Sequence, residues 1–164
     1  MSKAICYLKG EDINVIVTFF QTRSGVIIKA DVSDLPPGKH GFHIHKSGDM
    51  TNGCESACDH WNPFNKEHGD SSGNERHAGD LGNIESGKRY RYFLKDVSIS
   101  GATNPKKNLL GRSVIIHEDE DDLGITDHPL SKTTGNSGKR SACSIIGLLD
   151  DSCISASGKT RKSS

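Results

Sequence analysis

The histidines of this chain are grouped in a pattern that few folds can accommodate. Six of the chain's 8 histidines and one aspartate fall in a single stretch, at His43, His45, His60, His68, His77, Asp80 and His117. Neutral imidazoles together with one carboxylate form a ligand set typical of copper and zinc. The pattern therefore predicts metal binding by a fold that brings distant parts of the chain to one place.

A strand is expected at residues 39–46, which include the pair His43 and His45. Successive side chains of a strand point to opposite faces, so the two imidazoles point the same way, about 7 Å apart at ~3.3 Å per residue. Phe42 and Ile44 then lie on the other face. This strand is expected to present two metal ligands on one side and apolar side chains on the other.

Short β-rich runs account for most other apolar residues. Further strands are expected at 5–8, 15–20, 26–32, 90–94, 97–99, 109–117 and 144–149, and no amphipathic helix is expected. Two long segments, at about 47–82 and 118–142, show no periodicity, and metal ligands would organise the first of them. The expected fold is all-β, an eight-stranded antiparallel barrel or sandwich with two long functional loops.

The composition limits the other classes of function. Lys+Arg and Asp+Glu number 21 each, so the total charge indicates neither nucleic acid nor a membrane as a partner. No apolar run suits a signal peptide or a membrane span, and the expected location is cytoplasmic. The chain is expected to form one domain, residues 1–150, followed by a polar, disordered tail, residues 151–164.

Two neighbouring metal sites are the simplest interpretation of the seven candidate ligands. Four nitrogens suit Cu(II), whereas three nitrogens and one oxygen suit Zn(II). Seven side chains would then fill eight coordination positions. One imidazole must therefore serve both metals through its two ring nitrogens.

Several motifs resemble the copper–zinc superoxide dismutase family. They are Gly41-Phe42-His43-Ile44-His45, Gly48-Asp49, Asn62-Pro63, residues 75–83, Asp121-Asp122-Leu123-Gly124 and Thr134-Gly135-Asn136-Ser137-Gly138. The resemblance runs from about Lys3 to Leu149. It implies a Greek-key barrel, usually a homodimer, that converts superoxide to dioxygen and hydrogen peroxide by copper redox cycling, in antioxidant defence.

The resemblance also assigns ligands position by position. It gives copper the ligands His43, His45, His60 and His117, and it gives zinc the ligands His60, His68, His77 and Asp80. His60 is thus the expected shared ligand and proton carrier. Asp121 is expected to link His43 to His68 through hydrogen bonds, which would fix their tautomers.

Substrate docking and a disulfide follow from the same resemblance. Arg140 is expected to dock the superoxide anion beside copper, with Thr134 lining the same funnel. Cys54 and Cys143 are expected to form a disulfide. The remaining cysteines, Cys6, Cys58 and Cys153, are expected to be free thiols, His40 a structural residue and His128 a loop residue.

The chain departs from the family pattern at several positions. Cys58-Asp59 replaces a Gly-Pro pair, Ser47 replaces an interface aromatic, Pro129 and Leu130 replace glutamates, and Asp119 and Thr133 replace lysines. We expect a weaker dimer, and attraction of superoxide that centres on Arg140. No proline adjoins Cys143, so copper loading is expected not to require a dedicated chaperone strictly.

Two other functions remain as alternatives. A non-catalytic, metal-binding or chaperone-like relative would carry an added MxCxxC or CxC motif or lack copper ligands, and this chain shows neither feature. A zinc hydrolase would need an open position on zinc and a carboxylate base, and Asp80 closes the inferred zinc site.

Overall fold

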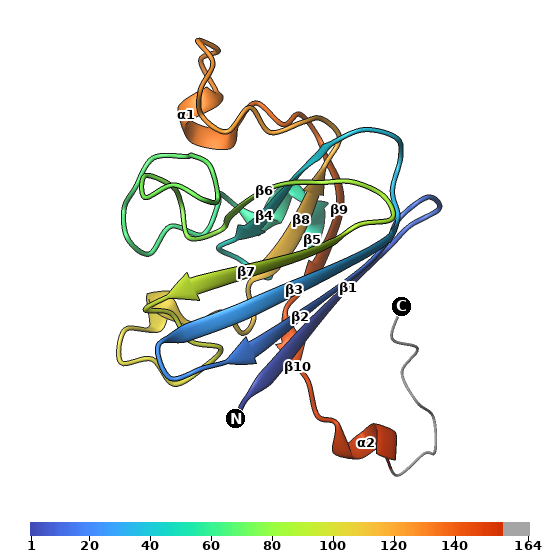
Figure 1. The fold of residues 1–164 in the computed structure, drawn as a ribbon, viewed down its shortest axis with the longest axis vertical. Helices are drawn as coiled ribbons and strands as arrows, with labels where there is room; N and C mark the ends of the chain where they lie inside the picture. The colour runs from blue at the N-terminus through green and yellow to red at the C-terminus, as the bar shows by residue number, and fades with distance from the viewer. Residues whose placement is uncertain (156–164) are drawn as a thin grey trace.

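Two antiparallel β-sheets packed face to face form the body of the protein, in a computed structural model that describes residues 1–155 (Figure 1). The first sheet has the strand order β10-β1-β2-β3-β7 and the second β6-β4-β8-β9. The strands are β1 Lys3–Lys9, β2 Asn14–Gln21, β3 Gly25–Asp34, β4 His40–His45, β5 Thr51–Cys54, β6 Asp80–Ile84, β7 Arg89–Lys95, β8 Ser113–His117, β9 Arg140–Ile145 and β10 Gly147–Leu148. The helical turns are η1 Glu55–Ala57, η2 Pro105–Lys107, α1 Ser131–Thr134 and α2 Ser152–Ser155.

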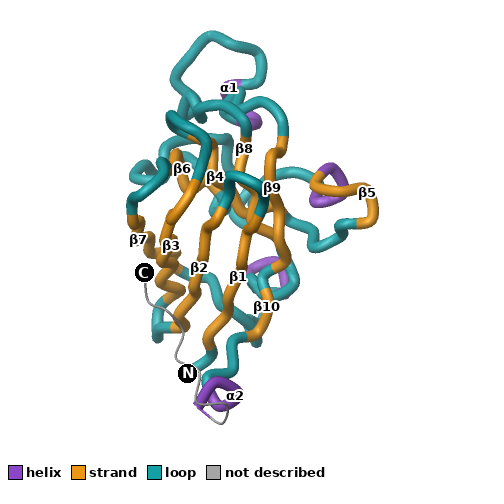
Figure 2. The backbone as a smooth tube through the Cα atoms, turned by 90° about the vertical axis from the view of Figure 1, so that its right-hand side faces the viewer, coloured by secondary structure: helices purple, strands orange, loops and turns teal. Residues whose placement is uncertain are grey.

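The connections between the sheets follow a Greek-key pattern, which confirms the expected fold class. Strands β1, β2 and β3 pair in sequence order, and the chain then crosses to β4 in the second sheet. Strand β7 returns to pair with β3, while β6 and β8 flank β4. Strand β5 and η1 project from the side of the barrel (Figure 2).

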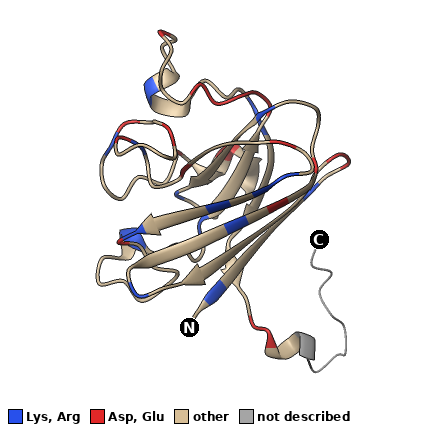
Figure 3. Ribbon diagram, viewed as in Figure 1, with Lys and Arg blue, Asp and Glu red and all other residues tan. Residues whose placement is uncertain are grey.

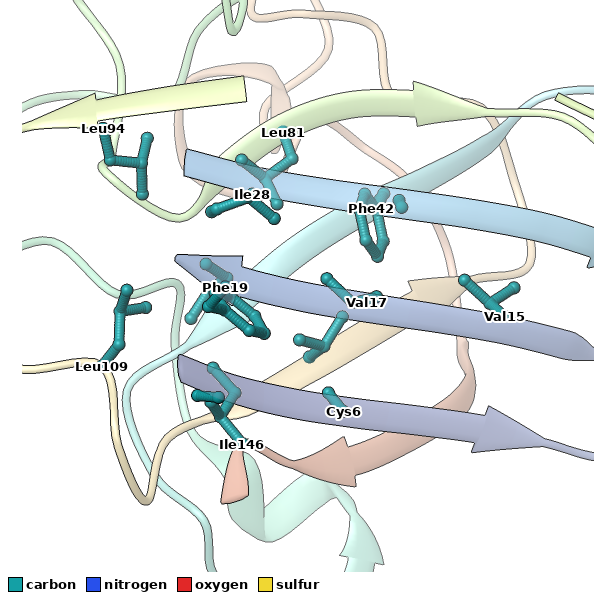
Figure 4. Close-up of a cluster of buried hydrophobic side chains, with 14 of the residues drawn as sticks. Cys6, Val15, Val17, Phe19, Ile28, Phe42, Leu81, Leu94, Leu109 and Ile146 are labelled. Atoms are coloured by element: carbon teal, nitrogen blue, oxygen red, sulfur yellow. The ribbon is translucent and has the colours of Figure 1, made fainter. Parts of the chain in front are cut away.

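The space between the sheets holds the apolar core (Figure 4). Val15, Val17 and Phe19 of β2 face Phe42 of β4 there, and all four are fully buried. Each such side chain contributes roughly 1.5–3 kcal/mol on burial. A one-residue slip would turn these side chains to solvent, so the core also fixes the strand register.

The prediction of a strand at residues 97–99 is wrong. Asp96 has a positive φ of 58°, which ends β7 in a turn, and only Ser98 makes an isolated bridge, to Asn108. Val97 and Ile99 are nevertheless buried in the core. Their apolar spacing therefore reflects packing of a loop rather than strand pairing.

Other boundaries differ from the expected ones. Strand β6 was missed because its sequence, DLGNI, is short and contains Gly82 at a positive φ of 77°. The expected run 109–117 forms a strand only from Ser113, since Gly111 turns the chain at φ 88°. Strand β9 begins four residues earlier than expected, at Arg140.

Both faces of β4 are buried, and a long loop is bonded along the edge of β4 beyond the residues that pair with β6. The amide of Ile44 donates to the Gly79 carbonyl at 2.8 Å, and the amide of Trp61 donates to the Ile44 carbonyl at 2.8 Å. A Cβ at Gly79 would meet the Ile44 carbonyl oxygen at 2.1 Å, so only glycine allows this approach. An isolated bridge between His45 and His60 completes the attachment.

The end of the chain is described only in part. Residues 152–155 form α2, and Asp151 lies 2.7 Å from the Lys3 ammonium. The remainder of the expected disordered tail, residues 156–164, lies outside the described residues. No helix within residues 1–155 has the length and apolar character needed to span a membrane.

Candidate metal centre

Four imidazoles meet over the face of β4 that points away from the core. His43 and His45 belong to β4, His60 follows η1, and His117 ends β8. One ligand nitrogen from each lies within 4.8 Å of the others, and all four residues are buried. We refer to these residues as the four-histidine group.

Hydrogen bonds fix the tautomers of three of these imidazoles. His43 Nε2 donates to Asp121 Oδ2 at 2.6 Å, His45 Nδ1 to the Cys58 carbonyl at 2.7 Å, and His117 Nδ1 to the Gly138 carbonyl at 3.1 Å. The lone pair of each ring then sits on the opposite nitrogen, and those nitrogens are buried without a hydrogen-bond partner. An unsatisfied buried acceptor costs about 1–3 kcal/mol, whereas a metal ion would satisfy all three. The group therefore fits a nitrogen-bound metal such as copper.

The imidazoles of this group are held in the neutral form that binds metals. Burial lowers the pKa of His43 and of His45 well below the usual value of 6.5. Burial likewise lowers the pKa of His117, to about 4. Metal binding at these three residues therefore does not have to displace protons at neutral pH.

A second group surrounds one carboxylate oxygen, Asp80 Oδ1. The Nδ1 atoms of His60, His68 and His77 lie 2.8, 3.0 and 3.3 Å from it, and His60 Nδ1 lies 3.2 Å from His77 Nδ1. A zinc tetrahedron with bonds of 2.0–2.1 Å has ligand–ligand edges of about 3.3 Å. Three nitrogens and one oxygen at nearly this separation fit zinc.

His60 belongs to both groups. Its Nδ1 faces Asp80 and His77, which leaves Nε2 for the four-histidine group, and its ring lies 4.1 Å from that of His43. His43 also lies within 4.8 Å of the second group. Its Nε2 is taken by Asp121, however, so its unpaired nitrogen serves the first group.

Asp121 connects the two groups. Its second oxygen accepts from His68 Nε2 at 2.8 Å, opposite its bond to His43. Asn83 of β6 holds it in place by accepting from the Asp121 amide at 2.7 Å and donating to the Asp121 carbonyl at 2.9 Å. Burial lowers the pKa of His68, but its bonds with Asp121 and Asp80 outweigh this and raise the pKa to about 9. Metal binding at His68 therefore releases a proton.

The two groups open onto a cleft of about 940 Å³. Its lining includes His45, His60, His77 and His117 from the ligand groups, with Thr134 and Arg140 at their side. Five cations and two carboxylates also line it, namely Lys46, Lys66, Lys132, Lys139, Arg140, Asp59 and Glu67. The excess of positive charge makes the cleft attractive to a small anion.

Arg140 is anchored by the backbone of the loop opposite it. Its Nη1 donates to the Cys54 carbonyl at 2.8 Å, and its Nη2 donates to the Cys58 carbonyl at 2.7 Å. The Cys58 carbonyl thus accepts from both Arg140 and His45. This shared acceptor fixes the distance between the guanidinium and the four-histidine group.

The residues expected from the sequence come together, and the structure adds others. All seven expected ligands, Asp121, Arg140 and Thr134 lie at the centre or its cleft, and Cys54 is disulfide-bonded to Cys143 with a Cα–Cα distance of 5.6 Å. His40 bonds the carbonyls of Pro36 and His117, and His128 is exposed. Sequence reasoning missed Asn83 and the Cys58 carbonyl, because neither is a metal-ligand residue type. The one available signal in the sequence was that Cys58 stands where the family has glycine, which indicates an unusual backbone conformation there.

A β-barrel with one four-nitrogen site and one adjacent three-nitrogen, one-oxygen site defines the class of copper- and zinc-binding oxidoreductases. Residues 13–146 match the model of the copper/zinc superoxide dismutase family. The chain therefore belongs to this family; its activity is superoxide dismutation, with copper and zinc as cofactors.

Individual proteins show the same similarity. Superoxide dismutase (Cu-Zn) 5 of Dictyostelium discoideum is 46% identical over 147 residues, which cover 88% of this chain and 97% of that protein. Superoxide dismutase (Cu-Zn) 2 of Mesembryanthemum crystallinum is 46% identical over 151 residues, covering 89% and 95%. The crystal structure of the clock protein EA4 superposes with a TM-score of 0.78 at 42% identity, covering 90% of this chain and 94% of that one.

Proposed function

We propose a specific division of the ligands for this dismutase. His43 Nδ1, His45 Nε2, His60 Nε2 and His117 Nε2 hold copper, and the Nδ1 atoms of His60, His68 and His77 with Asp80 Oδ1 hold zinc. The observation that carries the proposal is the set of three buried nitrogens without partners, each left unprotonated by a hydrogen bond on the far side of its ring.

Copper, when bound, supplies the one-electron chemistry that converts two superoxide anions and two protons into dioxygen and hydrogen peroxide. His60 supplies the proton handling. Its Nε2 can accept and return a proton while its Nδ1 stays beside Asp80 and His77, which keep the ring in place. Asp121 holds the rings of His43 and His68, so that this proton exchange does not disturb the other ligands.

Arg140 and Thr134 bind and orient the substrate in this proposal. The guanidinium is a planar cation that suits a small anion, and two carbonyls hold it beside the four-histidine group. Thr134, at the end of α1, lines the same cleft and limits its width. Superoxide is therefore expected to meet Arg140 before it meets the metal.

The variant His60→Ala tests the ligand division. It should lower the bound content of both metals, because His60 contributes to each group, and dismutase activity should be lost. The variant His128→Ala, in an exposed loop, is the matched control and should retain both metals. A His60→Ala protein with one copper and one zinc and unchanged copper absorption would refute the shared ligand.

A homodimer is proposed from one continuous surface. Exposed apolar side chains Leu110, Ile145 and Leu148 lie on segments joined by hydrogen bonds between Gly111 and Ile146 and between Ile146 and Arg112. Ile5 and Gly48, which the family resemblance also places at the dimer interface, lie on the same side, with Gly48 against the Gly111 carbonyl. Ser47 contributes no apolar area, so we expect a weaker dimer. Sedimentation that gives only single chains of 17.7 kDa at micromolar concentration would exclude it.

Three further features belong to the proposal. Residues 1–150 form the enzyme domain and 151–164 an appended tail, and the enzyme acts in the cytoplasm. Copper loading does not strictly require a chaperone, because the segment from Lys139 to Cys143 contains no proline. Expression in cells that lack the copper chaperone should still give active enzyme, and complete inactivity there would contradict this.

A further inference from the structure

The outward face of the first sheet carries an excess of positive charge. Alternate side chains of β1, β2, β3 and β7 point away from the core. Six cations and two carboxylates are among them, namely Lys3, Lys9, Lys29, Arg89, Arg91, Lys95, Asp31 and Asp34. The whole chain has a formal net charge of +0, so this face concentrates charge that is balanced elsewhere (Figure 3).

Two of these cations stand directly opposite each other. Lys29 of β3 pairs in register with Arg91 of β7, and the row continues through Thr18 to Ile5 without a carboxylate. Asp31 lies in the next row of this face, opposite Arg89. Like charges directly opposite on neighbouring strands are destabilising. An anion bound between Lys29 and Arg91 would remove this repulsion.

Aromatic side chains border the same cations. Phe20, Ile27 and Phe93 lie side by side in the row next to Lys29 and Arg91, and the Lys29 ammonium lies 5.3 Å from the centre of the Phe20 ring. Phe93 and Tyr7 are each 46% exposed. A shallow groove of about 400 Å³ joins Phe20 and Ile27 to Lys29 and Arg91. The face therefore offers anion-binding groups and flat apolar rings at neighbouring positions.

We propose that this face binds single-stranded nucleic acid, with phosphates at Lys29 and Arg91 and a base stacked on Phe93. Proteins that bind single strands combine a basic surface with aromatic rings in this way. A double helix would present only its phosphates to this face, because its bases are paired and stacked inside, so it would not use the exposed Phe93. The equal totals of acidic and basic residues indicate no nucleic-acid partner for the chain as a whole. The fold nevertheless gathers six of the cations on one face of the first sheet.

The proposal leaves the metal centre untouched. Neither Lys29, Arg91, Phe20 nor Phe93 lines the cleft that leads to the ligand groups. The surface proposed for the dimer comprises Ile5, Gly48, Leu110, Ile145 and Leu148, whereas the proposed contacts lie on β3 and β7. Metal-loaded, dimeric enzyme can therefore be used for the test.

Binding is measured by fluorescence anisotropy with a labelled 20-nucleotide oligo(dT) at low salt. Wild-type enzyme should bind with a dissociation constant in the range of about 10⁻⁶–10⁻⁴ M. The double variant Lys29→Glu with Arg91→Glu should bind at least ~10-fold more weakly, and its dependence of log K on log salt should be shallower by about 1.4. Phe93→Ser should weaken binding ~5-fold or more with little change in the salt slope. Lys39→Glu, which reverses one charge at a position outside this sheet, should bind like the wild type, and so should differ from Lys29→Glu alone.

Other ligands and the variants' own properties decide the interpretation. All variants should keep dismutase activity, because none of the substituted residues lines the cleft of the metal centre. The proposal is overturned if oligo(dT) does not bind at 0.05 M salt or if Lys39→Glu weakens binding as much as the double variant. It is also overturned if a duplex of equal length, or vesicles containing phosphatidylserine, bind more tightly than the single strand.

Discussion

Replacing Cys58 by glycine should stabilise this protein. Cys58 has φ 65° and ψ −151°, a region of backbone conformation that is essentially reserved for glycine. The residue is exposed, so loss of its thiol removes little packing. The conformation is nevertheless needed, because it turns the Cys58 carbonyl toward both His45 and Arg140.

The magnitude follows from two opposing effects. A non-glycine residue in such a region costs about 1–3 kcal/mol, which Cys58→Gly would recover. The greater freedom of glycine in the unfolded chain offsets about 0.4–1 kcal/mol of that gain. The net increase in the free energy of unfolding is about 1 kcal/mol, or about 2–4 °C in melting temperature for a chain of this size.

Calorimetry on the metal-loaded, disulfide-intact protein measures this difference. Cys58→Ala is the matched control, since it removes the thiol but keeps the Cβ and with it the strain. Cys58→Gly should melt above both the wild type and Cys58→Ala, with dismutase activity unchanged. Equal melting temperatures for Cys58→Gly and Cys58→Ala would show that residue 58 is not strained.

Two further variants address the centre and its cleft. Asp121→Asn offers one oxygen where two are needed, so either His43 or His68 loses its hydrogen-bond acceptor. Metal affinity, measured by competition with a chelator, should fall ~10–100-fold. An unchanged affinity would contradict the role of Asp121. Arg140→Glu should lower the dismutation rate sharply with metals retained. In the wild type the rate should fall between ~0.01 and ~0.15 M salt, as the screening length shrinks from about 30 to about 8 Å; in Arg140→Glu this dependence should flatten or invert. A wild-type rate and salt response in metal-replete Arg140→Glu would exclude Arg140 from docking.

The ligand groups were predictable from the sequence because few residue types bind copper and zinc. An HxH pair on a strand limits where the remaining ligands can lie, and the family resemblance supplied the division into two sets. Strands β1 to β4 were predictable for a similar reason, since their apolar residues alternate or run continuously. The ligand residues and these strands can therefore each be recognised from a pattern of neighbouring residues.

Features that depend on tertiary approach were not predictable in this way. Strand β6 gains its pairing from β4 rather than from its own composition, and Val97 is buried by loop packing. The Asn83 side chain bonds the backbone of Asp121, and the Cys58 carbonyl accepts from Arg140. Both contacts depend on how distant loops approach each other. The charge of the outward sheet face likewise depends on register, because Lys29 and Arg91 are 62 positions apart in the chain and meet only across β3 and β7.

The position of His77 has a consequence for metal exchange. Asp80 and His68 are almost completely enclosed, whereas His77 lines the cleft with His45, His60 and His117. Both metal sites are therefore reached from solvent through the same cleft. A chelator strong enough to extract zinc would have to approach past the copper ligands, and a bulky anion lodged against Arg140 would slow the departure of either metal. Replacement of one ion by another in this enzyme then depends on passage through this cleft as well as on the affinity of each site.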